Sequence, residues 1–181
     1  MKLFGWLRGK PRDRGSDRVA AWRRKWTEAI DADGQDPGPL REQLGTLAAP
    51  GVDLEVELEM LDALDQLRAA QREAAAGPLT VVETHHRVIG RDTCHFTAPA
   101  SLPSDEHHAT GRLLLTSARA VFVGGGRTAA TPWHAVHEIA RIDRDVLLVR
   151  ADRSPAAHFR FNTYGDAVLC VFLAGRLKRA R

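Results

Sequence analysis

Histidine and cysteine are the residue types in this chain that could bind a metal ion. A tetrahedral zinc site needs three or four N, S or O ligands that converge on one point. The pair Cys94-His95 and the His134-x-x-His137 spacing match no common zinc motif, and adjacent histidines on a strand point to opposite faces. We therefore expect no metal site and no cofactor, and we leave open a pH or metal role for the loop at residues 105–108. The eight histidines are His85, His86, His95, His107, His108, His134, His137 and His158.

The sequence lacks the common catalytic motifs. It contains no G-x-S-x-G nucleophile elbow, no P-loop and no H-E-x-x-H zinc motif. Gly124-Gly125-Gly126 lies between two apolar runs, so we expect a hairpin turn there rather than a phosphate-binding loop. Cys94 and Cys170 are expected to be small buried residues. The chain is therefore predicted not to be an enzyme.

The first 26 residues combine tryptophan with basic side chains. Such a segment suits an anionic membrane surface, where each basic residue contributes about 1 kcal/mol, and it also holds the ingredients of nucleic-acid binding. Alternatively, Trp22 and Trp26 pack on the folded protein and the first residues form a basic tail. Nucleic acid is not the expected ligand. The candidate membrane or partner contacts are Leu3, Phe4, Trp6, Leu7, Arg8, Trp22, Arg23, Arg24, Lys25 and Trp26.

Charge is unevenly distributed along the 181 residues. The net charge of +3 combines +7 over residues 1–26, −9 over residues 27–76 and +5 over residues 77–181. Segments of opposite sign favour contacts with each other or with charged partners. Two cysteines are too few for a disulfide framework, and no apolar run reaches the ~18–20 residues of a transmembrane helix. Because the N-terminus also lacks a signal-peptide pattern, the expected location is the cytoplasm or the cytoplasmic face of a membrane.

Helical periodicity dominates the N-terminal part of the chain. Residues 1–16 are predicted to be a basic, mobile arm, followed by a helical region over residues 17–77. The third predicted helix begins with acidic residues and ends with basic ones, which matches the helix dipole. The helices are expected at about 17–31, 40–49 and 52–76.

From residue 79 the pattern changes to short strands separated by turns. Such strands predict a small antiparallel sandwich or barrel. A helix at about 164–179 follows, in which Thr163 and Asp166 form a capping box. Its apolar stripe is expected to cover one open end of the barrel and comprises Val168, Leu169, Phe172, Leu173 and Leu177. The predicted strands are 80–88 as a lead-in, 93–98, 112–116, 120–123, 128–133, 136–142, 146–150 and 158–162.

Three short motifs mark the strand-rich part. They are the hairpin Gly111-Arg112-Leu113-Leu114-Leu115-Thr116-Ser117-Ala118-Arg119-Ala120-Val121-Phe122, the Thr131-Pro132-Trp133 segment and Phe159-Arg160-Phe161. In these motifs residues 93–178 resemble the PH-like superfold, particularly its GRAM-type and bacterial members. The resemblance implies a PH-like antiparallel β-sandwich or barrel, capped by a C-terminal helix, in the domain at residues 79–181. Together with the preceding α-helical region predicted from periodicity, it gives an α+β chain. It also implies a non-enzymatic domain that binds lipids, peptides or proteins.

One departure from the family bears on the ligand. Phosphoinositide sites of PH-like domains place Lys and Arg in and beside the first inter-strand loop, whereas the loop at residues 99–109 contains two acids and no Lys or Arg. Arg112, Arg119 and Arg127 are the candidate ligand face, or else solvated strand and turn residues. Two hypotheses follow. The chain is an interaction module that binds a protein partner or self-associates through its helical region, or it is a peripheral membrane protein that contacts anionic lipid through its N-terminal arm.

Overall fold

The computed structural model describes residues 14–32, 34–49, 51–105 and 108–180. The chain divides into two compact units, Met1–Leu61 and Asp62–Arg181. The boundary lies inside helix α3 (Glu55–Ala76). Within the described ranges, no helix is both long enough and apolar enough to cross a lipid bilayer.

The first unit is helical and is organised around two tryptophans. It contains α1 (Arg14–Asp31), α2 (Gly38–Leu47) and the first turns of α3. Trp22 and Trp26 lie four residues apart, so both indoles occupy one face of α1. Both are buried, and their Nε1–H groups donate to the backbone oxygens of Leu40 and Met60. The expectation that Trp22 and Trp26 contact a membrane or partner is therefore wrong, because these indoles form the core of their own unit.

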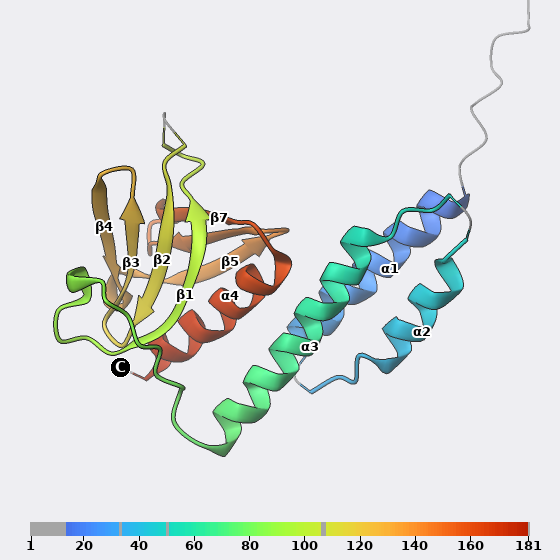
Figure 1. The fold of residues 1–181 in the computed structure, drawn as a ribbon, viewed down its shortest axis with the longest axis horizontal. Coiled ribbons are helices and arrows are strands. Elements are labelled where there is room, and N and C mark those ends of the chain that lie inside the picture. Colours follow the sequence, from blue (N-terminus) through green and yellow to red (C-terminus); the bar gives the residue numbers. More distant parts are fainter. Residues whose placement is uncertain (1–13, 33, 50, 106–107, 181) are drawn as a thin grey trace, which may run out of the picture. The chain divides into compact units, whose positions relative to one another are not determined.

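The second unit is an α+β domain built on a seven-stranded antiparallel sheet (Figure 1). Its strands are β1 (Cys94–Ser101), β2 (Thr110–Thr116), β3 (Arg119–Gly124), β4 (Arg127–Pro132), β5 (Glu138–Ile142), β6 (Asp145–Val149) and β7 (Pro155–Phe161). They are ordered β4-β3-β2-β1-β7-β6-β5, which makes β4 and β5 the edges. Helix α4 (Tyr164–Arg179) packs on the sheet. The predicted α+β fold with a C-terminal helix is confirmed.

The interior of this domain follows the strand alternation, with one adjustment in α4. Trp133 is buried between the strands and donates from Nε1 to the Thr116 oxygen at 2.9 Å. The predicted cap is present, since Thr163 Oγ1 accepts the Asp166 N–H at 3.0 Å. The α4 residues in the core are Ala167, Cys170, Ala174 and Leu177, whereas Leu169, Phe172 and Leu173 of the predicted stripe are only partly buried. Three of the four core positions are small, which allows the helix to approach the sheet closely.

The segment before β1 differs from its prediction. Residues 80–88 were expected to form a strand, but they run as an extended chain into the short 3-10 helix η1 (Arg87–Ile89). A single backbone bond, Val82 N–H to the Cys94 oxygen at 2.8 Å, links the segment to β1. Its side chains Val82 and Ile89 instead cover Cys94, Leu114 and Val121 on the outer face of the sheet. Burial on that face explains the apolar pattern that suggested a strand.

Candidate binding pocket

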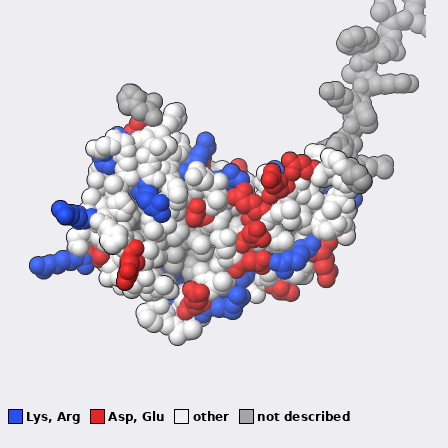
Figure 2. Space-filling model, viewed as in Figure 1, with Lys and Arg blue, Asp and Glu red and all other residues white. Residues whose placement is uncertain are grey.

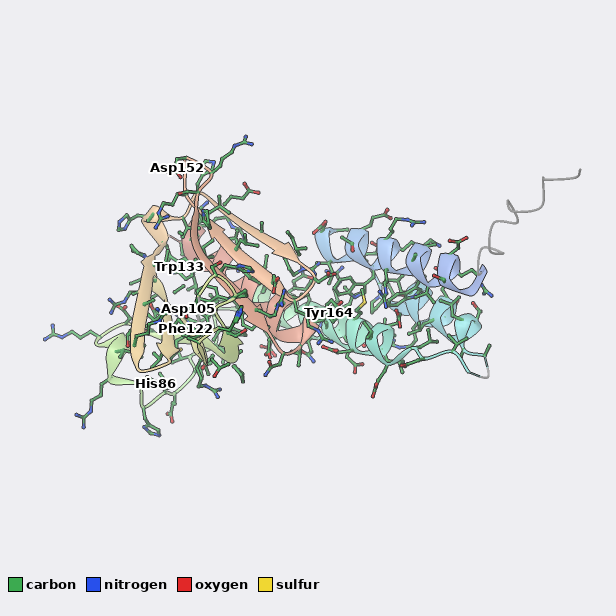
Figure 3. The ribbon with its side chains drawn as sticks, turned by 90° about the horizontal axis from the view of Figure 1, so that it is seen from above. His86, Asp105, Phe122, Trp133, Asp152 and Tyr164 are labelled. Atoms are coloured by element: carbon green, nitrogen blue, oxygen red, sulfur yellow. The ribbon has the colours of Figure 1, made fainter. Side chains whose placement is uncertain are left out.

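A pocket of about 340 Å³ opens in the second unit between the β1–β2 loop, β4 and β7. Small side chains create the space, because alanines stand where larger residues would fill a sandwich. Figure 3 marks Asp105, on the loop at one side of the pocket. The apolar lining of the pocket comprises Leu102, Ala129, Ala130, Pro132, Ala135, Ala156, Ala157 and Phe159. Its polar lining comprises Ser104, Asp105, Arg127, Thr131, Arg150 and His158.

Two arginines and one carboxylate set the charge of this pocket. Arg127, at the start of β4, forms an ion pair with Asp105 of the β1–β2 loop, so its positive charge is compensated. Arg150, in the turn between β6 and β7, donates to the Pro155 oxygen at 2.8 Å and to Ser154 Oγ at 3.4 Å. Both acceptors are neutral, and the exposed Asp152 of the same turn interacts with Arg150 only through its charge, so Arg150 is partly compensated at the rim. The pocket therefore combines an apolar floor with one arginine in an ion pair and one arginine that is only partly compensated.

A chain of polar contacts fixes the β1–β2 loop to β7. Asp145 and Arg160 face each other across β6 and β7, and the guanidinium donates Nε to Oδ1 and Nη2 to Oδ2, both at 2.7 Å. His158 Nε2 lies 3.4 Å from Asp145 Oδ2, and His158 Nδ1 lies 3.1 Å from Ser104 Oγ. The hydrogen bonds from Arg160 hold the pKa of Asp145 below its ordinary value.

These contacts place a serine, a histidine and an aspartate in one row, but the electrostatics do not favour a catalytic triad. In a triad the carboxylate stabilises a protonated histidine. Here Arg160 hydrogen-bonds both Asp145 oxygens, so the carboxylate is engaged by the guanidinium rather than reserved for His158. We interpret Ser104, His158, Asp145 and Arg160 together as a clasp. The clasp holds Ser104, and with it one wall of the pocket, against β7.

The three arginines of the predicted ligand face do not come together. Arg127 lines the pocket. Arg112 is exposed on β2 and donates to Thr97 Oγ1 at 3.2 Å. Arg119 pairs with Asp92 at 3.0 Å and donates to two backbone oxygens of η1, so it anchors the segment before β1.

Sequence reasoning missed Arg150 and the clasp residues. Arg150 is the last residue of the predicted strand 146–150 and precedes a turn, and nothing in that pattern separates it from an ordinary solvated arginine. His158 and Arg160 did carry a signal, because residues two apart on a strand share a face. That signal could have paired them with Asp145, at the start of the neighbouring strand.

The remaining candidate contacts of the N-terminal region fall into two groups. Leu3, Phe4, Trp6, Leu7 and Arg8 lie outside the described residues. On α1, Arg24 and Lys25 are exposed, and Lys25 Nζ donates to Gln43 Oε1 at 3.0 Å. Arg23 is committed to its own unit, since its Nε lies 2.7 Å from Oε1 of the buried Glu57. Acidic side chains gather along α3 on the face drawn in Figure 2.

The thiols and histidines were the other candidates for chemistry. Cys94 and Cys170 are both buried, and burial raises the pKa of each thiol. Across the described part of the chain, no three or more His, Cys, Asp or Glu side chains are grouped closely enough to hold a metal ion. His86, marked in Figure 3, lies before η1, on the segment that precedes β1.

Comparisons with known proteins give a structural likeness but no family. No family model matches the sequence, and no curated protein matches it. Among solved structures, the chain is similar to the complex of PDZ-RhoGEF DH/PH domains with GTP-gamma-S activated RhoA, with 13% identity and a TM-score of 0.43. The match covers 92% of this chain and 56% of that chain. The strand order and the terminal helix of the second unit fit a PH-like fold.

Proposed function

We propose that this chain is a non-enzymatic interaction module that binds a protein partner at the pocket between the β1–β2 loop, β4 and β7. One observation supports the proposal most strongly: the pocket joins an alanine-rich apolar floor to a rim arginine, Arg150, whose hydrogen bonds go only to neutral acceptors. Protein interfaces have an apolar centre and a polar margin, and arginine is more common in them than on the rest of the surface.

The charge of the pocket favours a protein over a phosphorylated lipid. A phosphoinositide headgroup carries several negative charges and needs several cations to replace its water. The pocket offers two arginines, and Asp105 already compensates one of them. A polypeptide that presents an apolar side chain and a single carboxylate satisfies the same groups without leaving a charge unpaired.

Self-association through the helical region is a second candidate, because apolar side chains are exposed there. Val52, Val56 and Leu58 are 42%, 37% and 55% exposed, respectively, on the first turns of α3 and just before it. Exposed apolar side chains are candidates for interaction surfaces. Val56 and Leu58 are two residues apart on α3 and point to different sides of the helix, so Leu58, the most exposed of the three, is the residue to test. Size-exclusion chromatography with light scattering tests this surface: a dimer of the full chain that Leu58→Glu converts to monomer supports it, and a monomeric full chain rejects it.

The peripheral-membrane alternative now depends on the arm alone, since Trp22 and Trp26 are buried. Flotation of the full chain with anionic and with neutral vesicles tests it, and a chain that lacks residues 1–13 shows whether the arm is responsible. Binding to anionic vesicles that is lost on truncation would favour the membrane. If neither chain binds the vesicles, the peripheral-membrane alternative is wrong. A cytoplasmic location is part of the protein-partner proposal.

The protein-partner proposal is tested by a matched pair of charge reversals. Arg150→Glu changes the rim of the pocket, whereas Arg153→Glu makes the same change in the same turn but outside the lining. Partners captured by the wild-type chain are purified and their affinities are measured with each variant. The proposal expects binding to survive Arg153→Glu and to weaken about tenfold or more with Arg150→Glu. Equal affinity for both variants would place the partner elsewhere and overturn it.

A further inference from the structure

The free edge of β4 lies against the same pocket. β4 is the last strand on its side of the sheet and pairs only with β3 in the described strand order. The two strands are joined by the two-residue turn Gly125-Gly126, whose φ angles are +59° and +73°. In such a hairpin the residues that flank the turn exchange both hydrogen bonds, and every second pair does the same.

This alternation identifies which backbone groups are unused. The pairs Gly124–Arg127, Phe122–Ala129 and Ala120–Thr131 carry the hydrogen bonds between β3 and β4. The N–H and C=O groups of Thr128 and Ala130 therefore point away from β3, toward the free edge. Pro132 ends the strand and adds an outward carbonyl without an N–H.

The side chains along this edge do not protect it. Natural proteins shield an exposed edge with charged residues, proline or a bulge, because unpaired backbone groups attract another strand. In β4 the charge and the proline stand at the two ends, at Arg127 and Pro132, and the residues between them are Thr128, Ala129, Ala130 and Thr131. Residues 128–130 are exposed. The edge is therefore short but open to a second strand.

The pocket supplies what an added strand needs beyond backbone bonds. Side chains alternate along a strand, so every second residue of an added segment could enter the space beside Ala156, Ala157 and Phe159. The volume of about 340 Å³ lies within the range of ligand-binding pockets. At the rim, Arg150 hydrogen-bonds only neutral acceptors among the described contacts, and the nearby Asp152 is exposed to solvent, so the guanidinium complements a carboxylate of a ligand.

We propose that an extended segment of the partner protein adds to the free edge of β4, places an apolar side chain in the pocket and directs an acidic residue to Arg150. This inference rests on the proposed function and names how the partner is recognised. Backbone groups of Thr128 and Ala130 hold the segment, and the pocket and Arg150 select its sequence.

Ala130 offers a variant that removes the edge donor alone. Ala130→Pro deletes the outward N–H, and because that group takes no part in the β3 ladder, the hairpin keeps its own hydrogen bonds. Ala130→Val is the matched control, since valine favours strands and retains the N–H. A thermal melt of each variant, followed by circular dichroism, confirms that the domain is folded before binding is measured.

The experiment uses random heptapeptides displayed on phage and selected against the full-length protein. Enriched sequences are synthesised with a fluorescent label, and their affinities are measured by anisotropy. The inference expects Ala130→Pro to weaken binding about tenfold or more and Ala130→Val to change it by no more than about twofold. The enriched peptides should contain an acidic residue. Their affinity should fall with Arg150→Glu and should not change with Arg153→Glu.

The possible failures separate the two proposals. If no peptide is enriched, or if enriched peptides bind Ala130→Pro as tightly as the wild-type chain, strand addition is wrong. If strand addition fails in this way but Arg150→Glu still abolishes binding of the captured partner, the pocket remains the proposed binding site and only the mode of recognition is wrong. If the full chain instead forms a dimer that Ala130→Pro abolishes, the edge is occupied by a second copy, which also contradicts the inference.

Discussion

Arg127 and Asp105 form an ion pair at the pocket, between the first residue of β4 and the β1–β2 loop. The pair links two walls of the pocket that are 22 residues apart in the sequence. It also decides the charge that a ligand meets there, because one of the two lining arginines is compensated before any ligand arrives.

Removal of the Asp105 carboxylate should make the pocket attract anions. In Asp105→Asn the charge of Arg127 is uncompensated, and one added cation near an anionic surface contributes about 1 kcal/mol, or about fivefold in affinity. Co-sedimentation with phosphatidylserine-containing vesicles at low salt measures the effect. The double variant Asp105→Asn, Arg127→Ala should return to the wild-type level, and a persistent increase would show that Arg127 is not the cause.

The clasp at Asp145 should give stability that depends on pH. The pKa of Asp145 is lower in the folded chain than in the unfolded chain, because Arg160 hydrogen-bonds the ionised form. Its contribution is therefore fully present above the unfolded pKa of about 3.9 and is lost as the pH falls through the folded pKa. Asp145→Asn should cost about 0.5–1 kcal/mol at pH 7.

Urea unfolding of both proteins at several pH values from neutral to acid checks this prediction. The difference between the wild-type chain and Asp145→Asn should shrink toward the acid end. A difference that is the same at every pH would mean that the ionisation of Asp145 contributes nothing to folding.

The buried tryptophans should matter for stability in the helical unit. Trp22→Ala removes an indole that is 2% exposed and is expected to cost about 3–5 kcal/mol. Arg24→Ala, an exposed position on the same helix, should change the stability by less than about 0.5 kcal/mol. Thermal unfolding followed at 222 nm by circular dichroism compares them, and similar melting curves would contradict the packing of Trp22.

Two glycines should respond to alanine in opposite directions. Gly124 faces Gly111 across β2 and β3, and a Cβ at Gly124 would collide with the Thr110 backbone oxygen, so Gly124→Ala should destabilise the hairpin by about 1–3 kcal/mol. Gly45 lies inside α2 with open space around its Cβ position, so Gly45→Ala should stabilise the chain by about 0.5–1 kcal/mol. Chemical denaturation measures the change in the free energy of unfolding of each variant. No change for Gly124→Ala would show that the strands can separate there.

Local patterns predicted most of the elements of the β-domain. The hairpin at residues 111–125 was readable because its apolar alternation and its glycines agree, and the structure pairs Leu113 with Phe122 and Leu115 with Ala120. The terminal helix was readable from Thr163 and its apolar residues. Alternation failed at residues 80–88, where a single extended segment packs on a sheet face without joining the sheet.

The pocket could not be predicted in the same way. Its lining comes from the β1–β2 loop, β4, Ala135, the turn after β6 and residues 156–159 of β7, and no short window contains these together. Its defining feature is space beside alanines, and an alanine in a sequence does not reveal whether its neighbours fill that space. The sequence did identify Arg127, but its compensation by Asp105 depends on the fold.

Amide chemical shifts of the isotopically labelled full chain, recorded while a captured and purified partner is added, test most directly whether the β-domain pocket is the binding site. Our account predicts that the largest changes occur at Ala130, Thr131 and Ala157, around the pocket, and that they disappear in Arg150→Glu. Changes confined to residues 14–61, with the pocket amides unmoved, would contradict it.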